Sequence, residues 1–213
     1  MKMKRLASVL ACAALTLGAT GMVQAANQPN FVVKLGLADV EPKADNGDLL
    51  GGAVSPDVGN SVRPSITFEY LPIPSVGIEL LAAWPFRNDV NITSAAVGNG
   101  TAASVNVLPP TLSVQYHILP ENVISPFVGV GINYSFIYGE DTKGPLAGNK
   151  LDLDNTWGFA AHFGLDFNIS KDLLITVDGR WIQMRSDAKL NGAPLGTVDI
   201  DPFVWGMSIG YRF

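Results

Sequence analysis

Hydrophobic and polar positions alternate along eight stretches of the chain. The final stretch shows the pattern most clearly, because apolar and mostly aromatic side chains occupy every second position from Phe203 to Phe213. Successive side chains of a β-strand point to opposite faces, so this alternation predicts a strand with one apolar face and one small or polar face. The eight predicted strands span residues 31–40, 63–71, 76–84, 105–118, 126–138, 154–169, 173–184 and 197–213.

The segments between the predicted strands alternate between long and short. Long segments rich in Gly, Asp and Pro cover residues 41–62, 85–103, 140–151 and 185–196, and short turns join the other strands. An even number of antiparallel strands with this alternation is the topology of a bacterial outer-membrane barrel, whose short turns lie on the periplasmic side. The predicted fold class is therefore all-β, an eight-stranded antiparallel transmembrane β-barrel with four long outer loops and three short periplasmic turns.

A soluble eight-stranded barrel is the alternative, and it would carry its apolar faces inward. In this sequence small and charged residues share one face of every predicted strand, while aromatic residues crowd the other face and recur near both strand ends. Such bulky side chains would overfill the interior of a soluble barrel, whereas a lipid-facing surface with aromatic girdles accommodates them. The pattern favours a barrel that crosses the membrane with its apolar face outward.

The N-terminus carries the three parts of a secretory signal peptide. A positive segment from Lys2 to Arg5 precedes a mostly apolar run, Leu6 to Val23, which ends in the small-residue cleavage pattern Val23-Gln24-Ala25. An N-terminal membrane anchor is the alternative, but the run is short for a helical span and contains two glycines. We therefore expect a signal peptide at residues 1–25 and an outer-membrane β-barrel at residues 26–213.

Composition and charge narrow the classes of function. The chain has 14 cationic and 19 acidic residues, and loss of three cations with the signal peptide leaves a formal charge of −8, which argues against a nucleic-acid partner. Cys12, the single cysteine, lies in the predicted signal peptide, so cysteine nucleophiles and thiolate metal sites are excluded from the mature chain. After residue 25 no apolar run approaches the ~20 residues of a membrane helix, so a membrane-embedded chain must close its hydrogen bonds as a barrel.

The inward-facing residues differ with height in the predicted barrel. Charges gather mainly toward the periplasmic side, and because buried charges must pair, we predict a plug of ion pairs that fixes the fold and blocks water and ions. The predicted plug consists of Lys34, Glu69, Glu79, Asp166, Asp178, Arg180 and Arg212. Small and apolar residues lie toward the outer side and predict a hydrophobic pocket or constriction. They are Leu81, Ala83, Ala160, Ile182 and Val204.

Two adjacent prolines, Pro109 and Pro110, interrupt the fourth predicted strand. Proline has no N–H to donate, so strand pairing beside them must weaken. A gap there would form a lateral opening through which an apolar ligand could leave without crossing a polar lumen. The simpler interpretation is that the two prolines end the strand at the outer loop.

No catalytic, metal or cofactor site is expected. His117 and His162 both face inward, but Asp166 lies four residues along the strand from His162, about 13 Å away, which is too far for a hydrogen bond. The chain has no HExxH motif, no P-loop and no paired Cys/His spacing. Histidines with partners inside the lumen are therefore the preferred interpretation.

Five blocks of sequence resemble the outer membrane protein W (OmpW) family in the family's own order. They read VGIELLAAWPF at Val76–Phe86, LPPTLSVQY at Leu108–Tyr116, PFVGVGINY at Pro126–Tyr134, DNTWG at Asp154–Gly158, and DIDPFVW at Asp199–Trp205 followed by the ending GYRF. These blocks cover nearly the whole predicted mature chain. The aromatic ending, with Tyr211 and Phe213, is in addition a signal that the barrel assembly machinery reads.

The resemblance implies an eight-stranded barrel around a narrow hydrophobic pocket or channel. It also implies uptake of small apolar molecules that leave sideways through the barrel wall into the bilayer. Leu81 matches a family leucine at a constriction, whereas the interior Trp of relatives on the seventh strand is replaced by Arg180. This departure argues against a fully hydrophobic gate, and Arg180 would instead pair with Asp178 or His162, or contact a ligand carboxylate.

Two functions from different classes therefore follow. The first is a cofactor-free channel or pocket for small hydrophobic molecules, with outer-membrane lipids, the ligand and the assembly machinery as partners. The second is a non-conducting structural or surface-receptor barrel whose loops meet host, phage or bacteriocin partners. The apolar outer lumen and the proline pair favour the first, and the charged plug with Arg180 favours the second. No oligomeric state follows from the sequence.

Overall fold

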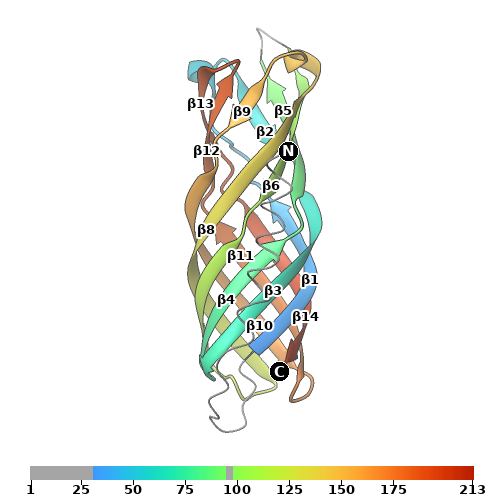
Figure 1. Cartoon of the computed structure of the whole chain (residues 1–213), viewed down its shortest axis with the longest axis vertical. Coiled ribbons are helices and arrows are strands. Elements are labelled where there is room, and N and C mark those ends of the chain that lie inside the picture. The colour runs from blue at the N-terminus through green and yellow to red at the C-terminus, as the bar shows by residue number, and fades with distance from the viewer. Residues whose placement is uncertain (1–30, 95–97) are drawn as a thin grey trace, which may run out of the picture.

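The computed structural model describes residues 31–94 and 98–213, so the predicted signal peptide at residues 1–25 lies outside the described residues. Eight antiparallel strands close into an elongated barrel (Figure 1). They are β1 (Phe31–Glu41), β3 (Ser61–Ile73), β4 (Val76–Ala83), β7 (Thr111–His117), β8 (Ile124–Thr142), β10 (Thr156–Asn168), β11 (Leu173–Ile182) and β14 (Phe203–Arg212). The predicted fold class is confirmed.

The first and last strands close the barrel. β1 pairs with β14 from Val32 opposite Arg212 to Glu41 opposite Phe203, and the backbone N–H of Phe213 donates to the carbonyl of Phe31 at 2.8 Å. On the far side, β8 pairs with β10, so each of the eight strands has a hydrogen-bonded neighbour on both sides. The short connections after β3, β7 and β10 lie at the same end as Phe31 and Phe213, which is the periplasmic end of such a barrel.

Large apolar side chains cover the outside of the barrel from the periplasmic turns up to the level of Pro109 and Pro110, a region that we call the membrane half. Leu35, Val130 and Ile209 are between 60% and 67% exposed there. An apolar surface this continuous requires lipid around it, because soluble proteins rarely expose more than small apolar patches. Among the described residues, no helix is long and apolar enough to cross a membrane.

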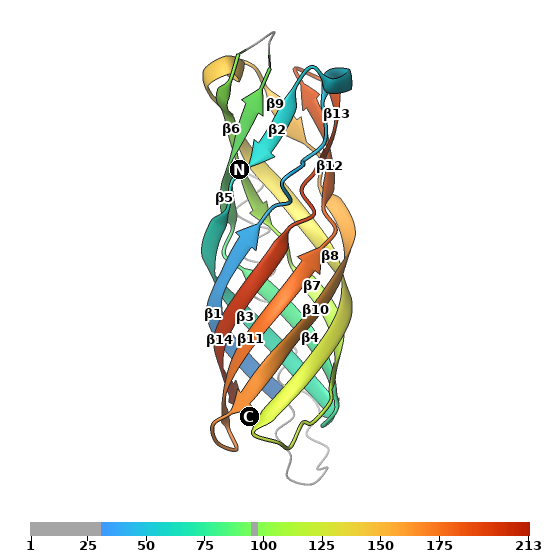
Figure 2. The same ribbon diagram turned by 180° about the vertical axis from the view of Figure 1, so that it is seen from behind.

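The long connections continue the barrel as β-hairpins above the membrane half (Figure 2). One sheet adds β6 (Gly100–Leu108), β5 (Phe86–Thr93) and β2 (Ser55–Val58) to the upper end of β8. A second sheet contains β9 (Leu151–Leu153), β12 (Arg185–Leu190) and β13 (Ala193–Asp199). Two single-turn 3₁₀ helices, η1 (Leu50–Gly52) and η2 (Gly144–Leu146), lie in the connections. We call these strands, together with the upper end of β8, the outer extension.

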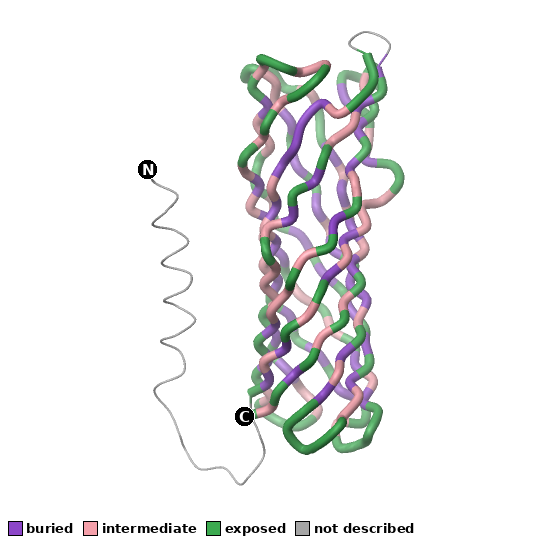
Figure 3. Tube along the Cα trace, turned by 90° about the vertical axis from the view of Figure 1, so that its right-hand side faces the viewer, coloured by how far each residue is buried: buried purple, intermediate pink, exposed green. Residues whose placement is uncertain are grey.

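The faces of the strands reverse in the outer extension. On β5 the side chains of Phe86 and Ile92 are buried inward, whereas those of Arg87 and Asp89 are 49% and 60% exposed. Buried and exposed residues alternate along the strands in both the membrane half and the outer extension (Figure 3). Water rather than lipid surrounds the outer extension, so its apolar residues turn to the interior.

The fourth predicted strand is two strands in the structure. It divides at Pro109 and Pro110 into β6, which belongs to the outer extension, and β7, which belongs to the membrane half. β6 also begins at Gly100, earlier than the predicted start at residue 105. The division agrees with the loss of two N–H donors at the prolines.

One buried side chain, Asn46, connects the two sheets of the outer extension. Its side-chain amide donates to the carbonyl of Asp199 on β13 at 3.0 Å and accepts from the N–H of Val58 on β2 at 3.0 Å. The backbone N–H of Asp199 also donates to the carbonyl of Asn46 at 3.0 Å. Asn46 is 1% exposed, so these hydrogen bonds join β2 to β13 away from water.

Candidate functional site

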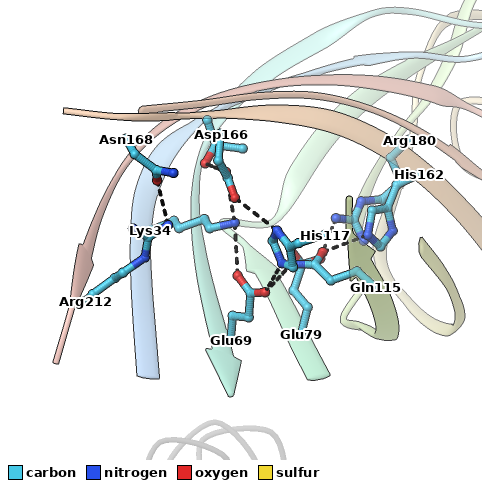
Figure 4. A network of polar contacts seen from close by, with 11 residues as sticks. Lys34, Glu69, Glu79, Gln115, His117, His162, Asp166, Asn168, Arg180 and Arg212 are labelled. Carbon is cyan, nitrogen blue, oxygen red and sulfur yellow. Dashed lines mark hydrogen bonds and ion pairs between the residues drawn. The ribbon is translucent and has the colours of Figure 1, made fainter. Parts of the chain in front are cut away.

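Lys34 on β1 lies at the centre of a polar network inside the membrane half (Figure 4). Its Nζ lies 3.1 Å from Oε2 of Glu69 on β3 and 3.6 Å from Oδ1 of Asp166 on β10. The same ammonium group lies 5.3 Å from the centre of the Phe127 ring on β8, within the range of a cation–π contact. Two carboxylates and an aromatic face therefore compensate a fully buried cation.

Two histidines extend the network. Nε2 of His117 lies 2.7 Å from Oε1 of Glu69, and its Nδ1 lies 3.5 Å from Oδ2 of Asp166. Gln115 donates to Glu69, and its Oε1 lies 3.0 Å from Nε2 of His162. Both histidines thus lie inside the lumen among polar partners, and Asp166 approaches His117 rather than His162.

Arg180 on β11 pairs across the lumen with Glu79 on β4. Its Nη2 lies 2.6 Å from Oε1 of Glu79, and its Nη1 lies 3.5 Å from the hydroxyl of Ser113. The sequence had suggested Asp178 or His162 as the partner, because they lie close to Arg180 along its own or the adjoining strand. The ion pair instead joins opposite walls, which a strand-by-strand reading does not reveal.

The network fills the lumen of the membrane half. Its eight polar members are between 1% and 5% exposed, namely Lys34, Glu69, Glu79, Gln115, His117, His162, Asp166 and Arg180. Arg212 was predicted to join them but lies nearer the periplasmic end, where its Nη2 donates to Oδ1 of Asn168 at 2.7 Å. Asp178 lies beside Arg180 on the wall of a small space of about 30 Å³.

A layer of apolar side chains lies above the network. Ala160, Ile182 and Val204, three residues of the predicted pocket, are buried there together with Phe86 and Met184. Of the other two predicted residues, Ala83 packs against this layer and Leu81 lines the small space beside Arg180. The five predicted pocket residues thus lie at similar heights in the barrel. Most of them belong to the apolar layer, which we call the packed floor.

A larger apolar cavity lies above this floor, inside the outer extension. Its volume is about 110 Å³, below the ~300–1,000 Å³ typical of sites for drug-sized ligands, so it suits only a small molecule. Its walls include Val58, Val90, Val105 and Leu195, and only Asn88 and Ser186 contribute polar side chains. Sequence reasoning missed this cavity, although the alternation Phe86, Asn88, Val90 and Ile92 was a signal for a strand with an apolar inward face.

The strand pairing is interrupted on one side of Pro109 and Pro110. Leu81 opposite Thr111 is the uppermost pair between β4 and β7, and Phe86 opposite Val107 begins the pairing between β5 and β6. Within the described residues, no backbone hydrogen bond joins residues 82–85 to residues 108–110. We call this interruption the proline gap.

On the other side of the prolines the wall is intact. The backbone N–H of Tyr134 donates to the carbonyl of Pro110 at 3.1 Å, and Asn133 Nδ2 donates to the same carbonyl at 3.1 Å. The proline gap therefore faces β4 and β5, and β8 holds the prolines in place. Val107 lines the large cavity and forms a pair directly above the gap, so the cavity floor and the gap are adjacent.

The remaining site predictions concern the C-terminus and metals. Tyr211 and Phe213 lie on the exposed surface of the barrel, with ring centres 4.8 Å apart, and their role in assembly stays a prediction. In the described ranges, no group of three or more His, Cys, Asp or Glu side chains is arranged to hold a metal ion.

Comparisons with known proteins identify relatives along the whole barrel. The OmpW family model matches residues 27–213. Outer membrane protein W of Salmonella typhimurium is 35% identical over 211 residues, which cover 96% of this chain and 98% of the relative. The dibenzothiophene metabolism operon protein PahQ of Pseudomonas aeruginosa is 24% identical over 200 residues, which cover 88% and 90%. The crystal structure of the outer membrane protein OprG from Pseudomonas aeruginosa matches with a TM-score of 0.78 at 27% identity, covering 87% of this chain and 96% of that one.

Proposed function

Because the chain belongs to the OmpW family of outer-membrane β-barrels, we propose that it takes up small apolar molecules through its outer extension and releases them sideways at the proline gap. The observation that carries this proposal is the position of the large apolar cavity, which adjoins the gap and is separated from the charged network below by the packed floor. A relative named for a dibenzothiophene metabolism operon supports an apolar, ring-containing ligand class.

The cavity is suited to capture apolar molecules from the outside. Its walls are made almost wholly of aliphatic side chains, and transfer of an apolar surface into such walls contributes about 25 cal/mol per Å². The small volume of the cavity restricts the ligand to a compact molecule. Capture therefore needs no cofactor and no energy source beyond the concentration gradient.

The charged network makes a straight exit through the lumen unfavourable. An apolar molecule would have to separate buried pairs such as Arg180 and Glu79, and an uncompensated buried charge costs about 3–5 kcal/mol. At the proline gap, by contrast, the ladder between β4 and β7 has already ended and lipid-facing side chains lie outside. The sideways route therefore breaks fewer interactions than the straight route.

The second candidate function is a non-conducting barrel that acts as a structural element or surface receptor. The packed floor beneath the cavity favours it, because Phe86, Ile182 and Val204 are all buried there. For the transport function, the floor must open toward the gap, and rotation of Phe86 would be the smallest such movement. Measured uptake distinguishes the two candidates directly.

The experiment compares naphthalene uptake by cells with and without the protein at matched levels of folded barrel. Val90→Trp fills the cavity from β5 and should lower protein-dependent uptake by roughly tenfold. Val62→Trp makes the same chemical change on the exposed surface of β3 and serves as the matched control, which should retain uptake. Equal uptake by cells with and without the barrel would favour the non-conducting candidate.

A further inference from the structure

Asn88 is an unusual residue on the wall of the large cavity. It lies on the inward face of β5, between Phe86 and Val90, and its side chain is 5% exposed. Its side-chain oxygen Oδ1 is buried and accepts no hydrogen bond from any group in the described part of the chain. The opposite residue on β6, Val105, offers only an apolar side chain.

The other polar side chain of the cavity does not share this property. The hydroxyl of Ser186 donates to the carbonyl of Asp154 at 2.8 Å, so this group already has a hydrogen-bond partner within the fold. A buried acceptor without a donor destabilises the fold, and native proteins satisfy the great majority of such groups. An acceptor that lines a binding cavity can instead be satisfied by the bound molecule.

We propose that the cavity selects apolar molecules that carry one uncharged hydrogen-bond donor, such as a phenol or an aliphatic alcohol, and that Asn88 accepts this hydrogen bond. The proposal rests on the uptake function and names the substrate class of the same cavity. Asn88 thus acts as a specificity-determining residue. Plain hydrocarbons still enter, but they leave the acceptor without a partner.

The surroundings of Asn88 restrict the number and charge of polar groups on the ligand. The remaining walls are aliphatic apart from Ser186, so a second hydroxyl would lose its hydrogen bonds to water without replacement. A carboxylate would meet no cation on these walls, because Arg180 and Lys34 lie in the network below the floor. One donor on an apolar body satisfies the buried acceptor of Asn88 and keeps apolar surface against the aliphatic walls.

The test uses three ligands of nearly the same shape with the wild-type barrel in lipid nanodiscs. 2-Naphthol carries a donor, 2-methoxynaphthalene keeps the oxygen but has no donor, and naphthalene has neither. Equilibrium dialysis against empty nanodiscs of the same lipids gives the protein-dependent binding of each. We expect 2-naphthol to bind roughly tenfold more tightly than the other two, relative to its partition into empty nanodiscs.

The variant Asn88→Leu provides the matched comparison, and the heat-modifiable mobility of the barrel verifies that it folds. This variant should lose the preference for 2-naphthol while it still binds naphthalene, whereas Asn88→Ser, which keeps an acceptor oxygen, should retain part of the preference. Equal binding of the three ligands by the wild-type barrel overturns the proposal, even if Asn88→Leu fails to fold.

A failure of the uptake proposal would give a different binding result in the same experiment. If none of the three ligands binds beyond the level of empty nanodiscs, both the cavity function and the role of Asn88 are contradicted. If all three bind and Asn88→Leu leaves their ratios unchanged, only the role of Asn88 is contradicted. The ligand series therefore separates the two outcomes.

Discussion

The membrane half and the outer extension of this barrel carry their apolar side chains on opposite faces of the wall. In the membrane half, apolar side chains such as Leu35 face outward and charges such as Lys34 fill the lumen. In the outer extension, Arg87 faces outward and the interior is aliphatic. β8 runs through both regions, and its inward side chains change from Asn133 in the lower region to Ile137 in the upper region.

The difference follows from the solvent around each region. Lipid surrounds the membrane half and water surrounds the outer extension, so the same strand alternation places apolar residues on opposite faces. Above the membrane, an apolar ligand finds apolar surroundings inside the barrel. At the level of the membrane, it finds them outside the barrel, in the lipid. In the proposed function, the ligand therefore passes from inside to outside at the boundary, which is the level of the proline gap.

The largest expected effect comes from breaking the charged network of the membrane half. Arg180→Met leaves Glu79 buried without its cation, and we expect the free energy of unfolding to fall by about 3–5 kcal/mol. Denaturant unfolding followed by heat-modifiable mobility measures the change. Replacing both partners, Arg180→Met with Glu79→Leu, should recover most of the loss, because no buried charge then remains alone.

An exposed arginine of the outer extension gives the contrast. Arg185 lies 3.4 Å from Asp199 and 3.7 Å from Asp201, but its side chain is 55% exposed. Arg185→Met should therefore change the free energy of unfolding by less than about 1 kcal/mol. A loss as large as that of Arg180→Met would contradict the distinction between a dry network below and solvated ion pairs above.

The next effect concerns the connection between the two outer sheets. Asn46→Ala removes the acceptor of the buried Val58 N–H, and we expect a local cost of about 1–3 kcal/mol in the outer extension. Amide hydrogen exchange at Val58 and Asp199 should accelerate, while amides of the membrane half keep their protection. Asn122→Ala in an exposed periplasmic turn is the control, and it should leave both regions unchanged.

A smaller effect is expected at the boundary between the regions. Pro109→Val combined with Pro110→Val restores two N–H donors. The Pro110 carbonyl faces β8 and successive backbone groups point to opposite sides, so the N–H at residue 109 faces β4 and adds about 0.5–1.5 kcal/mol when bonded. The closed wall becomes more stable, so naphthalene uptake should fall several-fold while denaturant stability is kept or raised. Pro72→Val, at the exposed periplasmic end of β3, should not alter uptake. Unchanged uptake in the double variant would exclude a sideways exit at this position.

The smallest effect concerns the polar exterior of the outer extension. A hydrogen bond from Ser104 holds the pKa of Asp89 below its ordinary value, and Lys143 lies 3.7 Å away. Because the folded-state pKa is lowered, this stabilisation is present above about pH 4 and is lost as the pH falls through the folded value. The side chain is 60% exposed, so we expect only a few tenths of a kcal/mol.

An NMR titration of the Asp89 carboxyl group measures this shift. In the Ser104→Ala variant the pKa should return toward its ordinary value, because the main cause of the shift is removed. A wild-type Asp89 that titrates normally would show that solvent screens the contact completely.

The alternation of residues was sufficient to predict the membrane half. Each lipid-facing strand presents apolar residues at every second position, and this signal predicted the strand number and the inward charges. The missing N–H groups of Pro109 and Pro110 predicted the weakened pairing beside them. The partners of those charges were not predictable, because Arg180 and Glu79 meet across the lumen and belong to strands that are not neighbours. Pairing across a barrel depends on the register of all intervening strands.

The outer extension was harder to read from the sequence. Its strands carry their apolar residues inward between polar, glycine-containing segments, which resemble ordinary loop composition. Phe86 to Ile92 alternates as clearly as a membrane strand, but Asn88 interrupts the apolar face at an inward position. The residue that weakened the sequence signal is the residue for which we propose a role in ligand selection.

Photolabelling in native outer membranes tests the central claim most directly. A diazirine derivative of naphthalene is added from outside, and mass spectrometry identifies the labelled residues. We expect labels on inward-facing cavity residues such as Val90 and Val105 and beside the proline gap, and none on inward-facing Gln115 or Thr176 below the floor. Labels on the inward residues of the membrane half would contradict the account, because the ligand would then pass straight through the charged network.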